Sequence, residues 1–385
     1  MIKETMTPTE RTWAAIKLEP CDRVPVAPLM DVMFPSRHKG MTVAEGIAHP
    51  RRGFQAIVDT FDDVGGWDAM IIPGYSLPVP PDIAAVMQVV IGDTRYPGKE
   101  PGFSDDSSPQ FIEKELLTVD DYDEIIKLGW TGFAEKNLGR FFPLDPELLL
   151  AWTKRQMDRY KSEGELWKAR NIPSLCGALV MSPLMFLSTR RSLVPFTQDL
   201  YRMPDKVQAV MDAMVDDCIK FAIEAARTTG IPGVELILER GGCFYYPLKI
   251  FERFEFRYIK KMVDAFAAEG FITVMHLDQD WTLNLPYFLD LPKKMCVCEL
   301  DSTTDIFKAK EILKDHLCIM GDVPAALNSI GTPAEMTAYC EKLIDHIGKG
   351  KTGFILSTGC TIPVDTKFEN FQAMVDSVKN HLPSN

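Results

Sequence analysis

The chain has 385 residues, of which 46% are hydrophobic and 25% are charged, as in ordinary globular proteins with a large core. Its formal net charge of −12 argues against nucleic acid and anionic membranes as partners, because both carry the same sign of charge. The N-terminus lacks a signal-peptide core, no apolar run approaches a membrane span, and the nine cysteines show no disulfide spacing. We therefore expect a cytoplasmic protein that binds neither nucleic acid nor membrane.

Helix-start signals and two short apolar segments alternate over the first seventy residues. Thr7-Pro8-Thr9-Glu10 combines a capping box with proline at the first helical position, so we expect a helix to start there. Thr42 and Pro50 open two further short helices in a similar manner. The expected helices are 8–18, 43–48 and 50–59, and the expected strands are 24–29 and 69–72.

The pattern loosens between residues 75 and 172. An apolar stretch at 86–91 suggests the edge of a hairpin, Thr118 caps a short helix, and Pro146 opens a longer helix that ends near Gly164. No low-complexity linker separates this region from the rest of the chain. We therefore interpret it as an elaboration within one domain that covers residues 1–385.

From residue 174 onward, strands and helices alternate regularly. The expected strands are 174–180, 234–238, 271–276, 295–300, 317–320 and 352–357. The expected helices are 203–229, 247–268, 304–314, 333–347 and 368–381, with further capping boxes at Thr332 and Thr366. With the two N-terminal strands this gives eight, the number that a (β/α)8 TIM barrel requires. An open doubly wound sheet is the alternative, but no Gly-rich phosphate loop follows the first strand.

Reactive side chains follow several predicted strands at their carboxyl ends, where (β/α)8 barrels place their active sites. In chain order they are Glu239, His276, Asp278, Asp301, Asp322 and Cys360. His276 and Asp278 lie at the end of the strand 271–276, and alternation along a strand points both side chains to one face. Cys360 lies in the turn Ser357-Thr358-Gly359-Cys360, whose glycine lets the backbone pass close to a ligand.

An imidazole, a thiol and a carboxylate at the same end of a barrel form a donor set that suits zinc. We expect His276, Asp278 and Cys360 to be the protein ligands, with a fourth position left open as in catalytic zinc sites. Glu239, Asp301 and Asp322 are the candidate catalytic residues, and Glu239 or Asp301 is also a candidate fourth ligand. Taken singly, the histidine and the cysteine each fit a plain structural role better than a catalytic one.

Four segments, spread over nearly the full chain, carry a family resemblance. They are Arg23-Val24-Pro25-Val26, residues 251–262, Gly321-Asp322-Val323-Pro324 and residues 359–374. Together they resemble the uroporphyrinogen decarboxylase superfamily. The resemblance implies a (β/α)8 barrel with one of two activities, because that superfamily contains true decarboxylases and also zinc methyltransferases that exchange methyl groups with a separate corrinoid protein.

Two departures argue against the decarboxylase branch of the superfamily. True decarboxylases carry an Arg-Gln-Ala-Gly-Arg segment soon after the first strand and an aspartate after the second. Here the first region, Leu29-Met30-Asp31-Val32-Met33-Phe34-Pro35, lacks those arginines, and the second, Ile71-Ile72-Pro73-Gly74, lacks the aspartate. A substrate with many carboxylates would therefore find no guanidinium clamps in a site this rich in acids.

The methyltransferase branch carries His-x-Cys and a later Gly-Cys, which His276 and Cys360 match. Asp278 stands where that branch has its first cysteine. A carboxylate in place of a thiolate keeps the formal charge but gives a harder, more Lewis-acidic zinc, which favours an oxygen-bearing substrate. The resemblance to enzymes that demethylate aryl methyl ethers thus implies a methyltransferase for a methyl ether, in particular a methoxylated aromatic compound.

The corrinoid (cobalamin) cofactor is expected on a partner protein, because the chain lacks an Asp-x-His-x-x-Gly corrinoid signature. The expected partners are therefore a corrinoid protein and a small-molecule methyl donor. Three alternatives stay open: a metal-independent decarboxylase that uses Asp301 or Glu239, a methylcorrinoid:thiol methyltransferase, and a non-catalytic scaffold for a tetrapyrrole or corrinoid partner.

Overall fold

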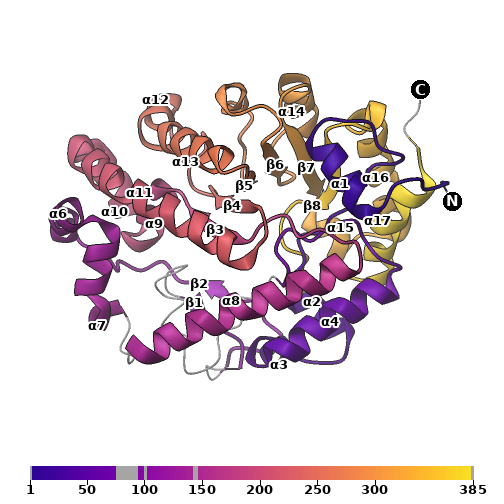
Figure 1. The fold of residues 1–385 in the computed structure, drawn as a ribbon, viewed down its shortest axis with the longest axis horizontal. Helices are drawn as coiled ribbons and strands as arrows, with labels where there is room; N and C mark the ends of the chain where they lie inside the picture. Colours follow the sequence, from indigo (N-terminus) through magenta and orange to yellow (C-terminus); the bar gives the residue numbers. More distant parts are fainter. Residues whose placement is uncertain (1, 75–93, 99–101, 142–145, 383–385) are drawn as a thin grey trace.

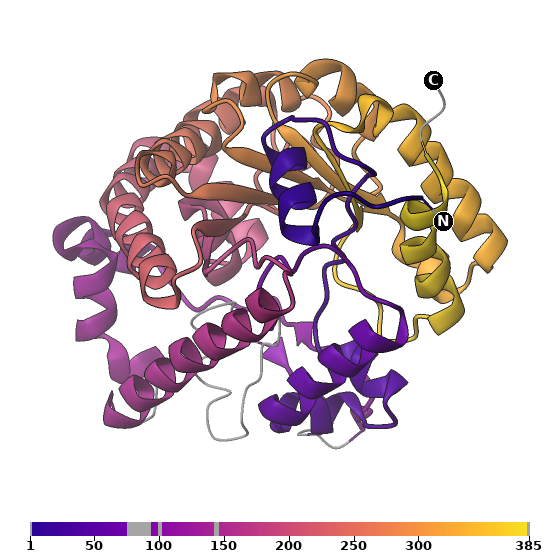
Figure 2. The same ribbon diagram turned by 45° about the vertical axis from the view of Figure 1, so that its right-hand side comes forward.

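A central parallel sheet carries the fold of this computed structural model, which describes residues 2–74, 94–98, 102–141 and 146–382. Six strands follow one another around the sheet in chain order, and helices cover their outer side (Figures 1 and 2). These strands are β3 (Ala178–Met181), β4 (Gly233–Ile237), β5 (Ile272–Leu277), β6 (Cys296–Leu300), β7 (Cys318–Val323) and β8 (Phe354–Thr358). All six expected strands from residue 174 onward are thus present, with ends shifted by a few residues.

The two N-terminal segments close this sheet into a ring. Val26 bridges Leu356 of β8 in parallel, and the amide of Asp68 donates to the carbonyl of Val26 at 2.7 Å. On the other side Met70 bridges Ser174, just before β3. The segments 24–29 and 69–72 therefore occupy the two remaining strand positions, although each pairs only through an isolated bridge. The protein is a (β/α)8 TIM barrel, as the sequence predicts.

Apolar side chains form two layers, one inside the barrel and one between the barrel and its helices. The inner layer includes Ala27, Ile71, Val274, Val297 and Ile355. The outer layer includes Leu236, Met275, Cys298, Ile319 and Leu356. Neighbouring residues of a strand belong to different layers because side chains alternate between the faces. Hence His276, which has the parity of Val274, points into the barrel.

The helices begin largely where the sequence predicts. They are α1 (Pro8–Ile16), α2 (Met33–His38), α3 (Val43–Ala48), α4 (Pro50–Asp63), α6 (Val119–Lys136), α7 (Leu138–Phe141), α8 (Pro146–Ala169), α9 (Pro183–Arg190), α10 (Leu193–Arg202), α11 (Pro204–Thr229), α12 (Leu248–Phe251), α13 (Arg257–Ala268), α14 (Ile306–Leu313), α15 (Ala325–Ser329), α16 (Pro333–His346) and α17 (Phe368–Asn380). A π-helical turn, Glu252–Phe256, joins α12 to α13, and 3₁₀ turns lie at Leu285–Asp290 and Lys349–Lys351.

The capping boxes predicted at Thr7 and Thr332 are confirmed, and the helix caps predicted at Thr42 and Thr118 are capping boxes as well. The one predicted at Thr366 is wrong, because α17 starts after Lys367, whose side chain makes no capping bond. The helix from Thr118 is longer than expected and kinks at Gly129, which has a φ of 72°. The hairpin expected at 86–91 lies outside the described residues.

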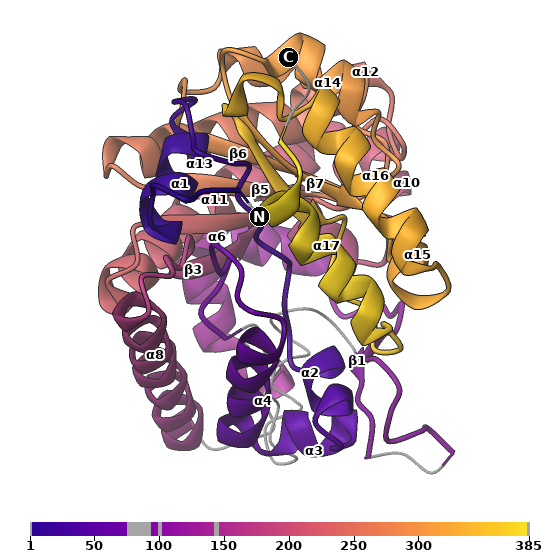
Figure 3. The same cartoon turned by 90° about the vertical axis from the view of Figure 1, so that its right-hand side faces the viewer.

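The region between the second strand position and β3 contains a short antiparallel pair, β1 (Thr94–Arg95) and β2 (Gln110–Phe111). It also contains the long helices α6 and α8. Helices α6 and α8 both pack on α11, so they are fastened to the barrel. Figures 1 and 3 show α2, α3, α4 and α8 grouped at one edge of the molecule. None of the described helices is both long and apolar enough to cross a membrane.

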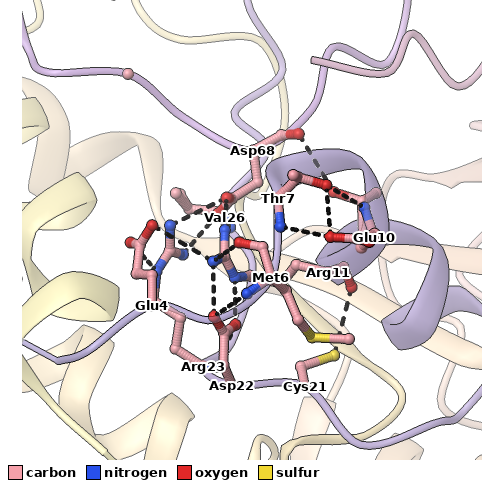
Figure 4. A network of polar contacts seen from close by, with 12 residues as sticks. Glu4, Met6, Thr7, Glu10, Arg11, Cys21, Asp22, Arg23, Val26 and Asp68 are labelled. Carbon is pink, nitrogen blue, oxygen red and sulfur yellow. Dashed lines mark hydrogen bonds and ion pairs between the residues drawn. The ribbon is translucent and has the colours of Figure 1, made fainter. Parts of the chain in front are cut away.

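A buried network of charges joins the first two strand positions (Figure 4). The carboxylate of Asp68 accepts from Arg11 at 2.6 Å, from Arg23 at 2.7 Å and from the amide of Val26 at 2.8 Å. All three charged side chains are almost fully buried. Because these segments share few backbone hydrogen bonds, this carboxylate supplies the connection that a longer strand pair would otherwise make.

Asp68→Asn is expected to lower the free energy of unfolding by about 3–5 kcal/mol, because two buried guanidinium groups lose part of their counter-charge. Urea denaturation measures the loss as a lower midpoint. The matched control is Asp62→Asn, whose exposed pair with Arg170 should contribute less than about 1 kcal/mol. Equal midpoints for the two variants would contradict the role assigned to Asp68.

Candidate metal centre

Three side chains expected to bind a metal meet at the carboxyl ends of β5 and β8. Cys360 Sγ lies 3.9 Å from His276 Nε2 and 3.9 Å from Asp278 Oδ2. The second carboxylate oxygen, Asp278 Oδ1, lies 3.4 Å from His276 Nε2. One donor atom from each residue fits within 4.8 Å of the others, so the three can share one ion.

A buried glutamate holds the other side of the imidazole. Glu299 lies opposite His276 in the register of β5 and β6, and its carboxylate is 2.9 Å from His276 Nδ1. Glu299 is 1% exposed, so this contact is shielded from water. A carboxylate there accepts the Nδ1 proton and leaves the lone pair on Nε2, the nitrogen that faces Asp278 and Cys360.

The Asp278 carboxylate lacks the partners that buried polar groups normally have. Its Oδ1 atom is buried and has no hydrogen-bond partner among the described residues, while Trp281 Nε1 donates to the Asp278 carbonyl at 2.8 Å and fixes the backbone. An unsatisfied carboxylate oxygen is costly unless a cation or a proton occupies it. Asp278 Oδ1 faces His276 Nε2 at 3.4 Å, an arrangement in which both atoms can contact one cation.

Burial shapes the protonation of all three groups. It raises the pKa of Asp278 to about 6 and raises the pKa of the Cys360 thiol. For His276, burial is the largest single effect and acts against the charged form, but the negative charges of Glu299 and Asp278 and the hydrogen bonds to Cys360 and Glu299 together outweigh it, so the pKa of His276 is raised well above its usual range. Before metal binds, the cluster therefore holds protons that an incoming cation would displace.

The candidate catalytic residues occupy three different environments. Glu239 follows β4 and has its Oε1 atom 3.8 Å from His276 Nε2, with 40% of its side chain exposed. It is thus placed beside the cluster and open to the mouth of the barrel. Its roles as catalytic group and fourth ligand stay predictions.

Asp301 and Asp322 lie further from the imidazole and make bonds of their own. Asp301 accepts from the amides of Gln279 and Thr303, both at 2.9 Å, and so ties the loops after β5 and β6 together. Asp322 is buried, accepts from Tyr339 Oη at 2.9 Å, and has a pKa raised to about 6 by burial. Their catalytic roles also stay predictions.

Gly359, the turn glycine before Cys360, was expected to let the backbone pass close to a ligand, and in the structure it lets the backbone pass close to the chain itself. A Cβ atom at Gly359 would lie 3.2 Å from both the Asp301 Cα and the Ser302 amide nitrogen. The close approach is thus to the loop after β6 within the protein. It brings Cys360 across the barrel mouth toward β5.

Sequence reasoning missed two acidic residues inside the barrel. Glu235 of β4 and Glu299 of β6 are each 1% exposed, and together with His276 they form a second group of potential ligands. Both oxygens of Glu235 and one of Glu299 have no hydrogen-bond partner in the described chain. The signal was an acidic residue within an otherwise apolar strand, as in Val234-Glu235-Leu236.

A small apolar cluster lies beside the imidazole on the opposite side from β6. It consists of Met181, Met185 and Ile237, and Ile237 pairs with His276 in the register of β4 and β5. Methionine side chains adapt to irregular shapes, so this cluster can serve as a pocket wall for an apolar group.

Comparison with known proteins agrees with this fold. Residues 175–381, more than half of the chain, match the family model "Uroporphyrinogen decarboxylase (URO-D)". The chain is 27% identical over 179 residues to a methylcobamide:CoM methyltransferase MtbA of Methanosarcina acetivorans, and 28% identical over 175 residues to the same-named protein of Methanosarcina mazei. Each match covers 45% of this chain and 50% of the relative, so the matched part spans about half the length of these relatives.

A solved structure supports the fold over almost its full length. A methyltransferase from Methanosarcina mazei superimposes with a TM-score of 0.64 at 15% identity, covering 97% of this chain and 99% of the other. At this identity the likeness concerns the fold alone. The family match, which includes β3 to β8 and the residues His276, Asp278 and Cys360, shows that this chain belongs to the uroporphyrinogen decarboxylase family.

Proposed function

We propose that this protein is a zinc-dependent methyltransferase that moves a methyl group from a methyl ether to a corrinoid held by a separate protein. The observation that carries the proposal is the meeting of His276, Asp278 and Cys360 at the mouth of the barrel. The names of the MtbA relatives support the methyl-transfer part.

The donor set fits zinc in both chemistry and spacing. Ligand atoms 2.0–2.3 Å from a tetrahedral zinc ion are about 3.3–3.7 Å from one another. The distances from His276 Nε2 to Asp278 Oδ1 (3.4 Å), from Cys360 Sγ to His276 Nε2 (3.9 Å) and from Cys360 Sγ to the other carboxylate oxygen, Asp278 Oδ2 (3.9 Å), are close to that range. One nitrogen, one oxygen and one sulfur leave a fourth position, beside which Glu239 lies.

Asp278 directs the proposal toward an oxygen-bearing substrate. Zinc bound by one thiolate acts as a stronger Lewis acid than zinc bound by two, and can polarise an ether oxygen. In the net reaction the methyl C–O bond breaks, the methyl group bonds to the reduced cobalt, and the oxygen leaves as an alcohol or phenol after taking a proton. Glu239, exposed to the mouth, is the group placed to supply that proton.

Residues around the site support a small apolar methyl donor and a large partner. Met181, Met185 and Ile237 offer an apolar wall that excludes water from the methyl group. On the loops after β4, β5 and β7, large apolar side chains are exposed at Phe244, Leu283 and Ile330. Exposed apolar groups at the rim of a site are typical of a docking surface, here for the corrinoid protein.

A thiol is the second candidate for the methyl-exchange partner. The relatives' names describe transfer between methylcobamide and CoM, and the reverse direction of transfer through the same cluster would serve such a reaction. The identity of the ligand at position 278 separates the two candidates, because a carboxylate and a thiolate tune zinc differently.

His276→Ala and Cys360→Ser are each expected to lose zinc and methyl-transfer activity together, from about one zinc per chain in the parent protein. Elemental analysis after demetallation and reloading measures the metal, and methylcobalamin formed from cob(I)alamin and a methoxylated aromatic measures activity. Cys243→Ser, at a half-buried cysteine outside the cluster, is the matched control and should keep both. Unchanged zinc in both variants, or full activity in a chelator with release of carbon dioxide, would favour a metal-independent decarboxylase.

Asp278→Cys is expected to keep zinc but to lower turnover of the methyl ether by about tenfold or more, because a second thiolate weakens the Lewis acid. Transfer between methylcobalamin and a thiol should rise in the same variant. Both rates are measured on protein with equal zinc content. A variant whose ether turnover is unchanged would show that the carboxylate does not select the substrate.

Glu299→Gln is expected to weaken zinc binding by about 10–100-fold, because a neutral amide makes His276 a less basic ligand than the carboxylate does. Competition with a chromophoric chelator measures the dissociation constant. Glu163→Gln, which removes another buried carboxylate away from the cluster, is the control for general effects of buried acids. If both variants bind zinc as the parent does, Glu299 does not tune the imidazole.

A further inference from the structure

A hollow away from the candidate metal centre lies between the N-terminus of α4 and the helix α8. It has a volume of about 1000 Å³, and none of its lining residues belongs to the metal cluster. We propose that this hollow binds an organic anion, whose phosphate or carboxylate groups contact arginines of both helices. These arginines are Arg51, Arg52, Arg155 and Arg159, and the site that they line is called the arginine hollow below. The proposal is independent of the proposed function.

The charge of the hollow is opposite to that of the protein. Four arginines line it in a chain with a formal net charge of −12, and Arg159 among them pairs with Glu163 at 3.3 Å. Asp158 and Glu163 are the acidic residues among its described lining residues. Arg51, Arg52 and Arg155 are exposed, and their side chains form no hydrogen bond or ion pair with the described part of the chain. Unpaired guanidinium groups from two separate helices are suited to bidentate contacts with phosphate or carboxylate.

The start of α4 adds to the positive field. This 14-residue helix begins at Pro50, and its N-cap residue His49 makes no side-chain capping bond. Its first turn contains no acidic residue and instead carries Arg51 and Arg52. Positive side chains are unfavourable at this end of a helix dipole unless an anion offsets them.

Buried polar atoms on the wall also lack partners. Glu163, 5% exposed, has one carboxylate oxygen with no hydrogen bond to the described residues, and the buried indole Nε1 of Trp152 has no partner among them either. Burial raises the pKa of Glu163 to about 7, so this group carries less negative charge than an exposed glutamate and repels an anion less. The wall thus offers the indole N–H group of Trp152 as a hydrogen-bond donor in addition to the guanidinium groups.

The size and the apolar part of the lining indicate an organic ligand rather than a single inorganic ion. Phe54, Trp152 and Leu166 lie on the wall among the arginines. Pockets of about 300–1000 Å³ with apolar walls and a few convergent polar groups are typical of small-molecule sites. The ligand class is therefore an anion with an apolar or aromatic body.

The test uses the full-length protein and two probes that separate the anion classes. Isothermal titration with inorganic pyrophosphate and with benzene-1,3,5-tricarboxylate should show saturable binding of at least one probe, weakened by added salt. Stronger pyrophosphate binding assigns a phosphate ligand, and stronger tricarboxylate binding assigns a carboxylate ligand. No binding of either probe at millimolar concentration would overturn the proposal.

The arginines are tested by substitution at exposed positions, where folding should be unaffected. Arg51→Gln and Arg155→Gln should each weaken binding of the probe by about tenfold, because each removes charge-assisted hydrogen bonds. Arg202→Gln, at an exposed arginine on α10 outside the hollow, is the control and should leave binding unchanged. Equal affinities in all three variants would overturn the assignment, and zinc content should be the same in each.

Discussion

The contact between Glu299 and His276 Nδ1 is the constraint on which the candidate metal centre depends. A histidine at the end of a barrel strand can turn its ring and can carry its proton on either nitrogen. The carboxylate on the neighbouring strand removes both freedoms, because it lies 2.9 Å from Nδ1 and is itself buried. Only then does Nε2 point at Asp278 and Cys360, and only then do side chains from β5 and β8 become one donor set.

Burying the Glu299 carboxylate beside a second acid, Glu235, has an electrostatic cost. Protonation of a buried carboxyl group lowers that cost. Glu235 and Glu299 are both buried near His276, and two ionised carboxylates could not share that volume. Burial, followed by the charge of Glu299, raises the pKa of Glu235, which favours the neutral form of Glu235. A neutral Glu235 adds no second negative charge beside the contact between Glu299 and His276.

The sequence predicted the periodic parts of this structure well, because their signals are local. Apolar runs predicted the positions of the strands, and all four threonines with a capping box directly precede the first residue of a helix. The Thr366 box failed because a capping pattern competes with tertiary contacts: the Lys367 amide donates to the Asn328 carbonyl, and the helix starts one residue later than that box requires. The sequence also placed His276, Asp278 and Cys360 at strand ends, from which their meeting follows once the barrel closes.

The sequence alone could not predict which residues of neighbouring strands lie opposite each other. Glu299 sits opposite His276 only because β5 and β6 pair with that offset, and no local pattern states the offset. The arginine hollow has the same origin, since Arg51 and Arg155 are far apart in the chain and meet only through the packing of α4 and α8. Pairings between distant segments are set by the whole core, so single-sequence reasoning detects the residues and not their partners.

Membership of the family therefore fixes the scaffold and leaves the chemistry to a few positions. The same barrel can present guanidinium clamps for an acidic substrate or a metal cluster for methyl transfer, because the loops at the strand ends vary independently of the core. In this chain the first strand position leads into Asp31 and Met33 without arginines, while the ends of β5 and β8 carry three side chains placed so that they could hold a metal ion. In the proposed function the donor at position 278 is the decisive one. A carboxylate there would keep the charge of the thiolate it replaces and change only the hardness of the site, which is the property that distinguishes an ether oxygen from a thiol sulfur.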